Sequence, residues 1–269
     1  MIWDARGVKS KEGSALIAVV FVLLIAAAIA GSLIGGARSD LQLSSNYELQ
    51  LENELASEAG IAAAILSLSD PGARPSLIAN GQGFTLSAGK KQLRVSIANE
   101  AGKINLNRTP NPLLRRLLQT VCPDDSGALE LWSAIEAALA RTKEGEKTFL
   151  TVEEIGRLPG ASAKLLAAIE PYVSVYSFRD VPDFGLAPSK LQALMSEGGN
   201  ATGLAAAQSR SPTNSGAASG VFTISASAAG SAASAPIEAV VYVTGDPARP
   251  YRILEWRQKA WTDKADCLG

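Results

Sequence analysis

Apolar residues fill the first part of the chain and then become periodic. No charged residue occurs from Ser14 to Ala37, a run long enough for a helix that crosses a bilayer, which needs roughly 20 apolar residues. Apolar residues then recur at helical spacing along one stripe: Leu43, Tyr47, Leu51, Leu55, Ala59, Ala62 and Leu66. No proline interrupts this stretch before Pro71, so the pattern predicts one long helix that ends near Asp70.

Beyond this helix the pattern changes to the two-residue alternation of strands. Two runs on either side of Gly89 and Lys90 predict a hairpin, and later runs predict further strands. The expected strands are Phe84–Ser87, Leu93–Ala98, Tyr172–Phe178, Val221–Ser227, Ile237–Thr244 and Tyr251–Arg257. Helical patterns lie between them, from about 111 to 170 and at Ser189–Ser196. The expected fold is therefore α+β: a long N-terminal helix packed on an antiparallel sheet, with a helical domain inserted between its strands.

These changes of pattern also give the expected organisation of the chain. The segments are a leader at 1–13, an apolar stem helix at 14–37, its amphipathic continuation at 38–70, the first part of the sheet at 71–100, an inserted helical domain at 101–196 with a strand near 172–178, a loop rich in Gly, Ala and Ser at 197–220, and the closing strands at 221–269. The loop lacks the apolar surface that offsets the entropy of ordering, and we assign it no function.

The composition excludes many kinds of catalytic site. The 269 residues include no histidine, which removes Ser-His-Asp and Cys-His catalysis and every metal site with a histidine ligand. Lys and Arg number 25 against 26 Asp and Glu, so the chain lacks the basic surplus of a nucleic-acid binder. We therefore expect a protein that is not an enzyme.

Three interpretations of the N-terminal segment are open. It can be a secretory signal cleaved after Ala28–Ala30, an uncleaved signal anchor, or a prepilin leader cleaved after Gly13. Arg6, Lys9 and Lys11 favour a cytoplasmic leader, with the rest of the chain across the membrane. The unbroken helical pattern favours the prepilin interpretation, because a signal peptide ends in an extended cleavage region.

Two motifs in the middle of the chain predict tight turns. Asn99–Asn107 has a strand-to-helix turn in which Asn105 and Asn107 can bind backbone groups. Thr151–Ile169 predicts two short helices around a turn at Pro159 and Gly160, and its Thr151 and Glu154 match a capping box. This second motif resembles a helix-hairpin-helix, which can offer backbone N–H groups to a DNA phosphate. The mixed charges around it favour a structural hairpin.

An acidic cluster and a pair of cysteines are weaker candidates for a site. Asp124, Asp125 and Glu130 could hold a hard cation such as Ca²⁺, but their spacing matches no EF-hand and fits a turn before a helix. We expect no cofactor, with calcium as the one candidate. Cys122 and Cys267 can form a disulfide if the chain folds in an oxidising compartment, and the sequence does not decide whether they pair.

Taken in order along the chain, these motifs resemble the K-type minor pseudopilins of bacterial type II secretion. The resemblance rests on the leader ending in Gly13, the apolar stem, Glu100–Asn107 with its Glu100 and Gly102, Val152–Gly160, and Tyr251–Arg257. It implies that prepilin peptidase cuts between Gly13 and Ser14 and that the new amine of Ser14 is methylated. The stem would assemble through Leu16, Ile17, Ala18, Val20 and Leu23.

The resemblance also implies a place in the cell and a set of partners. The stem would span the bacterial inner membrane once, with the remaining domain in the periplasm. The chain would join I- and J-type minor pseudopilins at the tip of a fibre built from the major pseudopilin, and bind no nucleic acid. Most pilins carry Glu at the position that Ala18 occupies. The K-type family characteristically lacks this Glu, so Ala18 fits the resemblance. The acidic motif that helps the family hold calcium is absent from Glu130–Glu136.

One function of another class is the alternative. A membrane-anchored DNA-handling protein of a competence or type IV pilus system would use the hairpin at Gly160. DNA affinity with a steep salt dependence would distinguish it from a pseudopilin.

Overall fold

The structure is a computed structural model that describes residues 12–70, 79–89, 91–108, 112–122, 126–143, 146–197, 219–229 and 235–259. In the first helix, side chains are described at 16–29, 31 and from 41 onward. The chain divides into two compact units, one up to Glu52 and one from Asn53.

The first element is a single 58-residue helix, α1 (Glu12–Ser69). Its part in the first unit carries exposed apolar side chains from Leu16 to Ile29, and Leu43, Tyr47 and Leu51 are exposed as well. Over the described residues, no helix meets the length and apolarity needed to cross a membrane. The span expected at 14–37 includes positions 14, 15, 30 and 32–37, whose side chains are not described.

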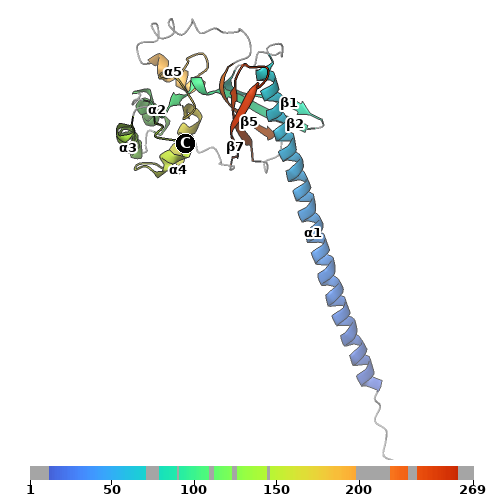
Figure 1. Cartoon of the computed structure of the whole chain (residues 1–269). Coiled ribbons are helices and arrows are strands. Elements are labelled where there is room, and N and C mark those ends of the chain that lie inside the picture. The colour runs from blue at the N-terminus through green and yellow to red at the C-terminus, as the bar shows by residue number, and fades with distance from the viewer. Residues whose placement is uncertain are drawn as a thin grey trace, which may run out of the picture. The chain divides into compact units, whose positions relative to one another are not determined.

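The second unit contains a five-stranded antiparallel sheet in the order β1-β2-β5-β6-β7 (Figure 1). Its strands are β1 (Asn80–Ala88), β2 (Lys91–Asn99), β5 (Gly220–Ala228), β6 (Ile237–Val243) and β7 (Tyr251–Gln258). β1 and β2 form the expected hairpin, with Gly89 at a positive φ of 60°. β5 pairs directly with β2, so everything between them is an insertion. This arrangement confirms the α+β fold class.

The last turns of α1 pack on one face of this sheet. Ile61, Ala64, Ile65 and Leu68 are buried against alternate residues of β2, β5 and β6, such as Val95, Ile224 and Val241. Alternation along each strand puts these residues on the same face. Burying such a side chain completely contributes about 1.5–3 kcal/mol, so this layer holds the sheet to the helix.

The apolar stripe that the sequence predicts lies elsewhere on the helix. Within the second unit its members are exposed, Leu55 at 56% and Leu66 at 67%, together with Ala59 and Ala62. We call these four residues the outer stripe. The helix therefore has two apolar faces, of which only the one with Ile61 and Ile65 covers the sheet.

The insertion between β2 and β5 forms a second body with its own core, here called the inserted lobe (residues 100–197). Its helices are η1 (Glu100–Gly102), α2 (Pro112–Val121), α3 (Gly127–Arg141), η2 (Val152–Arg157), α4 (Ala163–Ile169), η3 (Glu170–Tyr172) and α5 (Ser189–Glu197). Leu117, Leu131, Ile155 and Leu165 are completely buried between them. Figure 1 shows α2–α5 gathered apart from the strands of the sheet.

The strand expected at Tyr172–Phe178 is much shorter and lies in a different sheet. Only β4 (Val173–Ser174) forms, and it pairs in parallel with β3 (Ile104–Asn105) inside the inserted lobe. The Ser174 hydroxyl oxygen accepts hydrogen bonds from the backbone N–H groups of Tyr176 and Ser177, at 2.9 and 3.1 Å. This local turn ends the strand, because a side chain takes the donors that a neighbouring strand would need.

Candidate functional site

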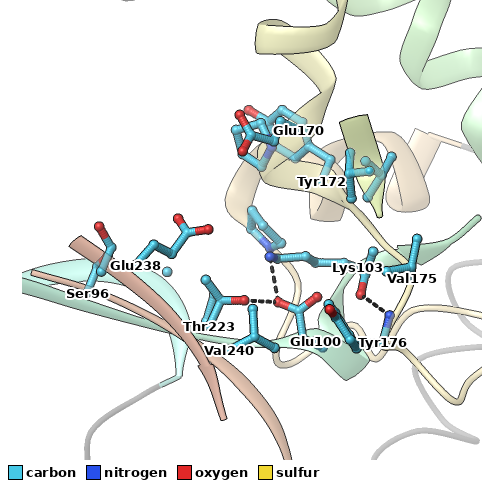
Figure 2. A pocket seen from close by; sticks show the side chains of 18 of the residues that line it. Ser96, Glu100, Lys103, Glu170, Tyr172, Val175, Tyr176, Thr223, Glu238 and Val240 are labelled. Carbon is cyan, nitrogen blue, oxygen red and sulfur yellow. Dashed lines mark hydrogen bonds and ion pairs between the residues drawn. The ribbon is translucent and has the colours of Figure 1, made fainter. Parts of the chain in front are cut away.

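The sheet face opposite α1 is polar and faces the inserted lobe. Alternation along the strands places Thr223 and Ser225 of β5, Glu238 of β6, and Glu255 and Arg257 of β7 on this side. Residues of η1, η3 and β4 lie opposite them. The two surfaces line a partly open pocket of about 340 Å³ (Figure 2).

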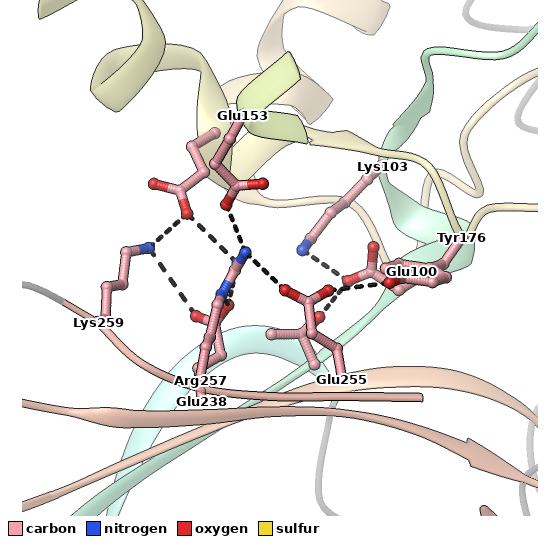
Figure 3. A network of polar contacts seen from close by, with 10 residues as sticks. Glu100, Lys103, Glu153, Tyr176, Glu238, Glu255, Arg257 and Lys259 are labelled. Atoms are coloured by element: carbon pink, nitrogen blue, oxygen red, sulfur yellow. Dashed lines mark hydrogen bonds and ion pairs between the residues drawn. The ribbon is translucent and has the colours of Figure 1, made fainter. Parts of the chain in front are cut away.

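Arg257 lies at the centre of the charged side chains at this interface and contacts four carboxylates. Its guanidinium contacts Glu153 of η2 at 2.6 Å, Glu170 of η3 at 3.5 Å and Glu255 at 3.2 Å, and it also pairs closely with Glu238. Lys259 adds contacts of its Nζ with Glu170 at 2.9 Å and Glu238 at 3.8 Å. We call these six residues the Arg257 network; Figure 3 shows the guanidinium among the carboxylates.

The environment of Arg257 favours the protonated, positively charged form of its guanidinium. Burial by itself lowers the pKa of the guanidinium, but the carboxylates, led by Glu238, outweigh it and hold this pKa above its ordinary value. Arg257 is 26% exposed and Glu238 is 9% exposed, so their attraction is less screened than that of a surface pair.

A second set of contacts lies beside the network. The carboxylate of Glu100, 3% exposed, accepts a hydrogen bond from the Thr223 hydroxyl at 2.6 Å and pairs with Lys103 Nζ at 2.6 Å. The Tyr176 hydroxyl donates to Glu255 at 2.9 Å. Burial, the hydrogen bond to Glu255 and the charge of that carboxylate raise the pKa of Tyr176 to about 12. Burial also raises the pKa of Tyr172.

Asn105 and Asn107 each hold a distant loop. Asn105 Nδ2 donates to the Ser177 carbonyl, and its Oδ1 accepts from the Asn107 N–H at 2.9 Å. The Asn107 amide both donates to and accepts from the backbone of Phe149. These side chains thus act on backbone groups of loops 42 and 72 residues away, rather than only within their own turn.

Two glycines allow close approach of backbones. A Cβ on Gly102 would lie 2.3 Å from the Leu186 carbonyl oxygen, and one on Gly160 would lie 2.5 Å from the Gly127 carbonyl oxygen. Gly160 also has a positive φ of 77°. Pro159, beside it, is exposed. The turn at Gly160 therefore seats the hairpin on the first turn of α3.

The helix-hairpin-helix expectation is only partly met. The first of its two helices is the 3₁₀ helix η2 rather than an α-helix, and Thr151 makes no capping hydrogen bond through its side chain. Glu154 accepts from the Leu150 N–H at 2.9 Å instead, so the expected capping box is wrong. Ser162 caps α4 by accepting from the Leu165 N–H at 3.0 Å. Glu153 and Glu170, on either side of this hairpin, face the sheet through the Arg257 network.

The other candidate residues that the structure describes are not part of this site. Leu16, Ile17, Ala18, Val20 and Leu23 are exposed on α1 in the first unit, and Gly13 and Ser14 lie in the same helix. Asp124 and Asp125 lie outside the described residues, and Glu130 is exposed on α3. Among the described residues, no group of three or more Cys, Asp or Glu is placed to hold a metal.

Cys122 is buried and disulfide-bonded. Cys267 lies outside the described residues, so the pairing of these two cysteines stays a prediction.

Sequence reasoning missed the Arg257 network. The signal was present in the alternation of Glu255, Arg257 and Lys259 at the end of the last strand, which places three charges on one side of it. Their partners, Glu153 and Glu170, are 104 and 87 residues from Arg257, and nothing in the sequence pairs them. Chemically, the arrangement fastens two parts of the chain together, because Arg257 and Lys259 at the end of the sheet attract Glu153 and Glu170 of the inserted lobe.

Comparison with known proteins agrees with this architecture. No protein-family model matches the sequence, and no curated protein matches it. A solved structure does: a chain of the GspK–GspI–GspJ complex of the type 2 secretion system from enterotoxigenic Escherichia coli. The likeness has a TM-score of 0.52 at 11% identity and covers 82% of this chain and 99% of that one. The chain shares the fold of a subunit of that secretion complex. The resemblance drawn from the sequence motifs is thereby confirmed for the fold.

Proposed function

We propose that this chain is a minor pseudopilin of a type II secretion system and acts as a structural protein rather than an enzyme. The observation that carries the proposal is the shared fold, which extends over 99% of a chain of the GspK–GspI–GspJ complex. The order of the motifs from Gly13 to Arg257 supports it independently, because the fold comparison does not rest on sequence identity.

The long helix supplies two surfaces suited to assembly. Exposed apolar residues from Leu16 to Ile29 suit a stem that lies in the inner membrane before assembly and among other stems afterwards. Prepilin peptidase would free this stem by cutting after Gly13, and the amine of Ser14 would then be methylated. The domain that follows would lie in the periplasm.

The outer stripe is a second surface suited to assembly, and it follows the stem along α1. Leu55, Ala59, Ala62 and Leu66 are spaced by four, three and four residues, the spacing of the seam between two packed helices. The two central alanines let a second backbone approach closely. The partners would be the I- and J-type minor pseudopilins in a tip complex that starts the fibre, with the major pseudopilin added below.

Co-purification tests the assignment. The tagged full chain, expressed with the I- and J-type minor pseudopilins of the same genome, should retain both after extraction in detergent. Leu55→Glu together with Leu66→Glu should reduce that retention, because a carboxylate does not pack in an apolar seam. Gln50→Glu adds a charge at an exposed helical position outside the stripe and is the control. Failure of the unmodified chain to retain either partner would contradict the proposal.

The N-terminus and the position in the fibre are tested separately. N-terminal sequencing of protein from membranes should begin at a methylated Ser14; a chain beginning near Gly31 would contradict the prepilin interpretation. Labels on the periplasmic domain should appear at the ends of sheared fibres, and labelling along the shaft would contradict a tip position. Ala18→Glu should be tolerated or mildly harmful, because an unpaired carboxylate in a bilayer costs about 2.5–3.5 kcal/mol.

A further inference from the structure

The sheet and the inserted lobe have separate hydrophobic cores. The buried apolar residues of the lobe core lie between Ile104 and Leu194, and those of the sheet core lie in α1, the segment at Ala79, β2, β5 and β6. Among the described residues, none belongs to both cores. The position of the lobe on the sheet therefore depends on the contacts at the interface between them rather than on a shared core.

Polar side chains make the hydrogen bonds and ion pairs that cross this interface. Arg257 reaches the lobe at Glu153 and Glu170, and Lys259 reaches it at Glu170. Tyr176 of the lobe donates to Glu255 of β7. Figure 3 shows Arg257 and Glu255 of the last strand meeting Glu153 and Tyr176 of the lobe. Interfaces of this polar kind permit relative motion of the bodies they join.

The charges on the two sides depend on Arg257 for their attraction. On the sheet side, Glu238 and Glu255 are balanced by Arg257 and Lys259, and the lobe side presents two carboxylates, Glu153 and Glu170. Without Arg257, two carboxylates and one ammonium of the sheet would face the two carboxylates of the lobe. Like charges would then dominate, so loss of this one side chain reverses the sign of the interaction.

We propose that the Arg257 network is an ionic latch: it holds a hinged inserted lobe on the sheet, and the lobe moves away when the ion pairs of Arg257 are lost. The chain passes from the sheet into the lobe at Asn99 and Glu100, so opening would bend the chain there and break the hydrogen bond between Thr223 and Glu100. The pocket of about 340 Å³ lies between the two bodies and would widen on opening (Figure 2). The latch does not depend on the proposed function of the chain.

A distance measurement on the full chain in detergent tests the latch. Spin labels attached through unnatural amino acids at Thr85 of β1 and Ser133 of α3, both exposed, report the separation of sheet and lobe and leave the cysteines untouched. A disulfide from Cys122 to Cys267 would limit any motion to the reach of the eight residues after Lys259, which is at most about 26–29 Å. Arg257→Ala is compared with Arg252→Ala, an exposed arginine on the same strand outside the network.

The expected results include a reversal of the effect of salt. The unmodified chain and Arg252→Ala should give one narrow distance distribution at low salt, and Arg257→Ala should broaden it toward longer distances. Added salt should broaden the distribution of the unmodified chain, because it screens attraction, and narrow that of Arg257→Ala, because it screens repulsion. Arg257→Lys keeps the charge and should stay closer to the unmodified chain.

Two outcomes would overturn the latch. One is a distribution for Arg257→Ala that matches that of Arg252→Ala at low salt. The other is the same direction of salt response in the unmodified chain and in Arg257→Ala. Circular dichroism of each variant shows whether both cores remain folded. If Arg257→Ala unfolds, the salt titration of the unmodified chain decides alone, and a distribution that stays narrow at high salt contradicts the latch.

Discussion

Asn107 and Phe149 hold each other by two reciprocal hydrogen bonds. Asn107 Nδ2 donates to the Phe149 carbonyl at 2.8 Å, and the Phe149 N–H donates to Asn107 Oδ1 at 2.7 Å. A primary amide is the side chain that offers a donor and an acceptor side by side, as a neighbouring strand would. One side chain thus replaces a strand pairing for Phe149, which is buried in the core of the inserted lobe.

Replacing this asparagine should destabilise the lobe. Asn107→Ala leaves the N–H and carbonyl of Phe149 without these partners, and the cost should be about 2–4 kcal/mol of unfolding free energy. Urea unfolding of the full chain in detergent, followed by tryptophan fluorescence, measures it. Asn46→Ala, at an exposed position of α1, is the control and should lose little. Equal stability of the two variants would contradict this role of Asn107.

Gly102 should tolerate no side chain. A Cβ there would lie 2.3 Å from the Leu186 oxygen and 2.8 Å from the Ala187 nitrogen, both backbone atoms that cannot rotate away. Gly102→Ala should therefore lower stability by about 1–3 kcal/mol or prevent folding of the lobe. Gly83→Ala is the matched control, because a Cβ there would meet its nearest atoms, in Arg94 and Val95, only at 3.6–3.8 Å, which is ordinary van der Waals contact. Thermal unfolding of the two variants should differ clearly, and similar midpoints would be evidence against the close contact.

The sequence contains enough local information to predict the layers of this fold. The three- and four-residue spacing gives α1, and alternation gives five strands to within a few residues, because both patterns follow from backbone geometry. Tyr172–Phe178 also alternates, yet only Val173–Ser174 pairs, because Ser174 binds the next backbone N–H groups. A competing side-chain hydrogen bond of this kind leaves no periodic signal.

The orientation of α1 and the site itself could not be predicted in the same way. Small and polar residues, Ser57 and Gly60, lie on the sheet-facing side of α1, whereas Leu55 and Leu66 lie outside. The sheet-facing side also carries Ile61 and Ile65, so both stripes are apolar and hydrophobicity alone does not decide which of them covers the sheet. The Arg257 network depends on pairs separated by 87 and 104 residues, which only the tertiary fold brings together.

The cysteines give a prediction about covalent linkage. Cys122 is disulfide-bonded, and the only other cysteine in the sequence is Cys267, so we expect these two to pair. The bridge would close a loop of more than a hundred residues and stabilise the chain by about 2–5 kcal/mol. Thiol counting on denatured, unreduced protein should find no reactive thiol. Two reactive thiols would contradict the bridge, and Cys267→Ser should expose one.

Tyr176 should make stability depend on pH in the alkaline range. Its pKa is raised from 10 to about 12, first by burial and then by Glu255, whereas in the unfolded chain the phenol has its ordinary value. Between these values the unfolded chain loses a proton that the folded chain retains. The contribution is therefore fully present below pH 10 and is lost as the pH rises through about 12.

Two variants separate this contribution from the titration of other groups. Tyr176→Phe should weaken the decline of unfolding free energy above pH 10, and Tyr251→Phe, at an exposed position of β7, should leave the decline unchanged. Glu255→Gln removes the charge that disfavours the phenolate, so it should lower the pKa of Tyr176, measured by the absorbance of tyrosinate. An equal decline of the unfolding free energy in Tyr176→Phe and Tyr251→Phe would mean that the protonation of Tyr176 is independent of folding. In that case the hydrogen bond to Glu255 does not hold the Tyr176 phenol neutral.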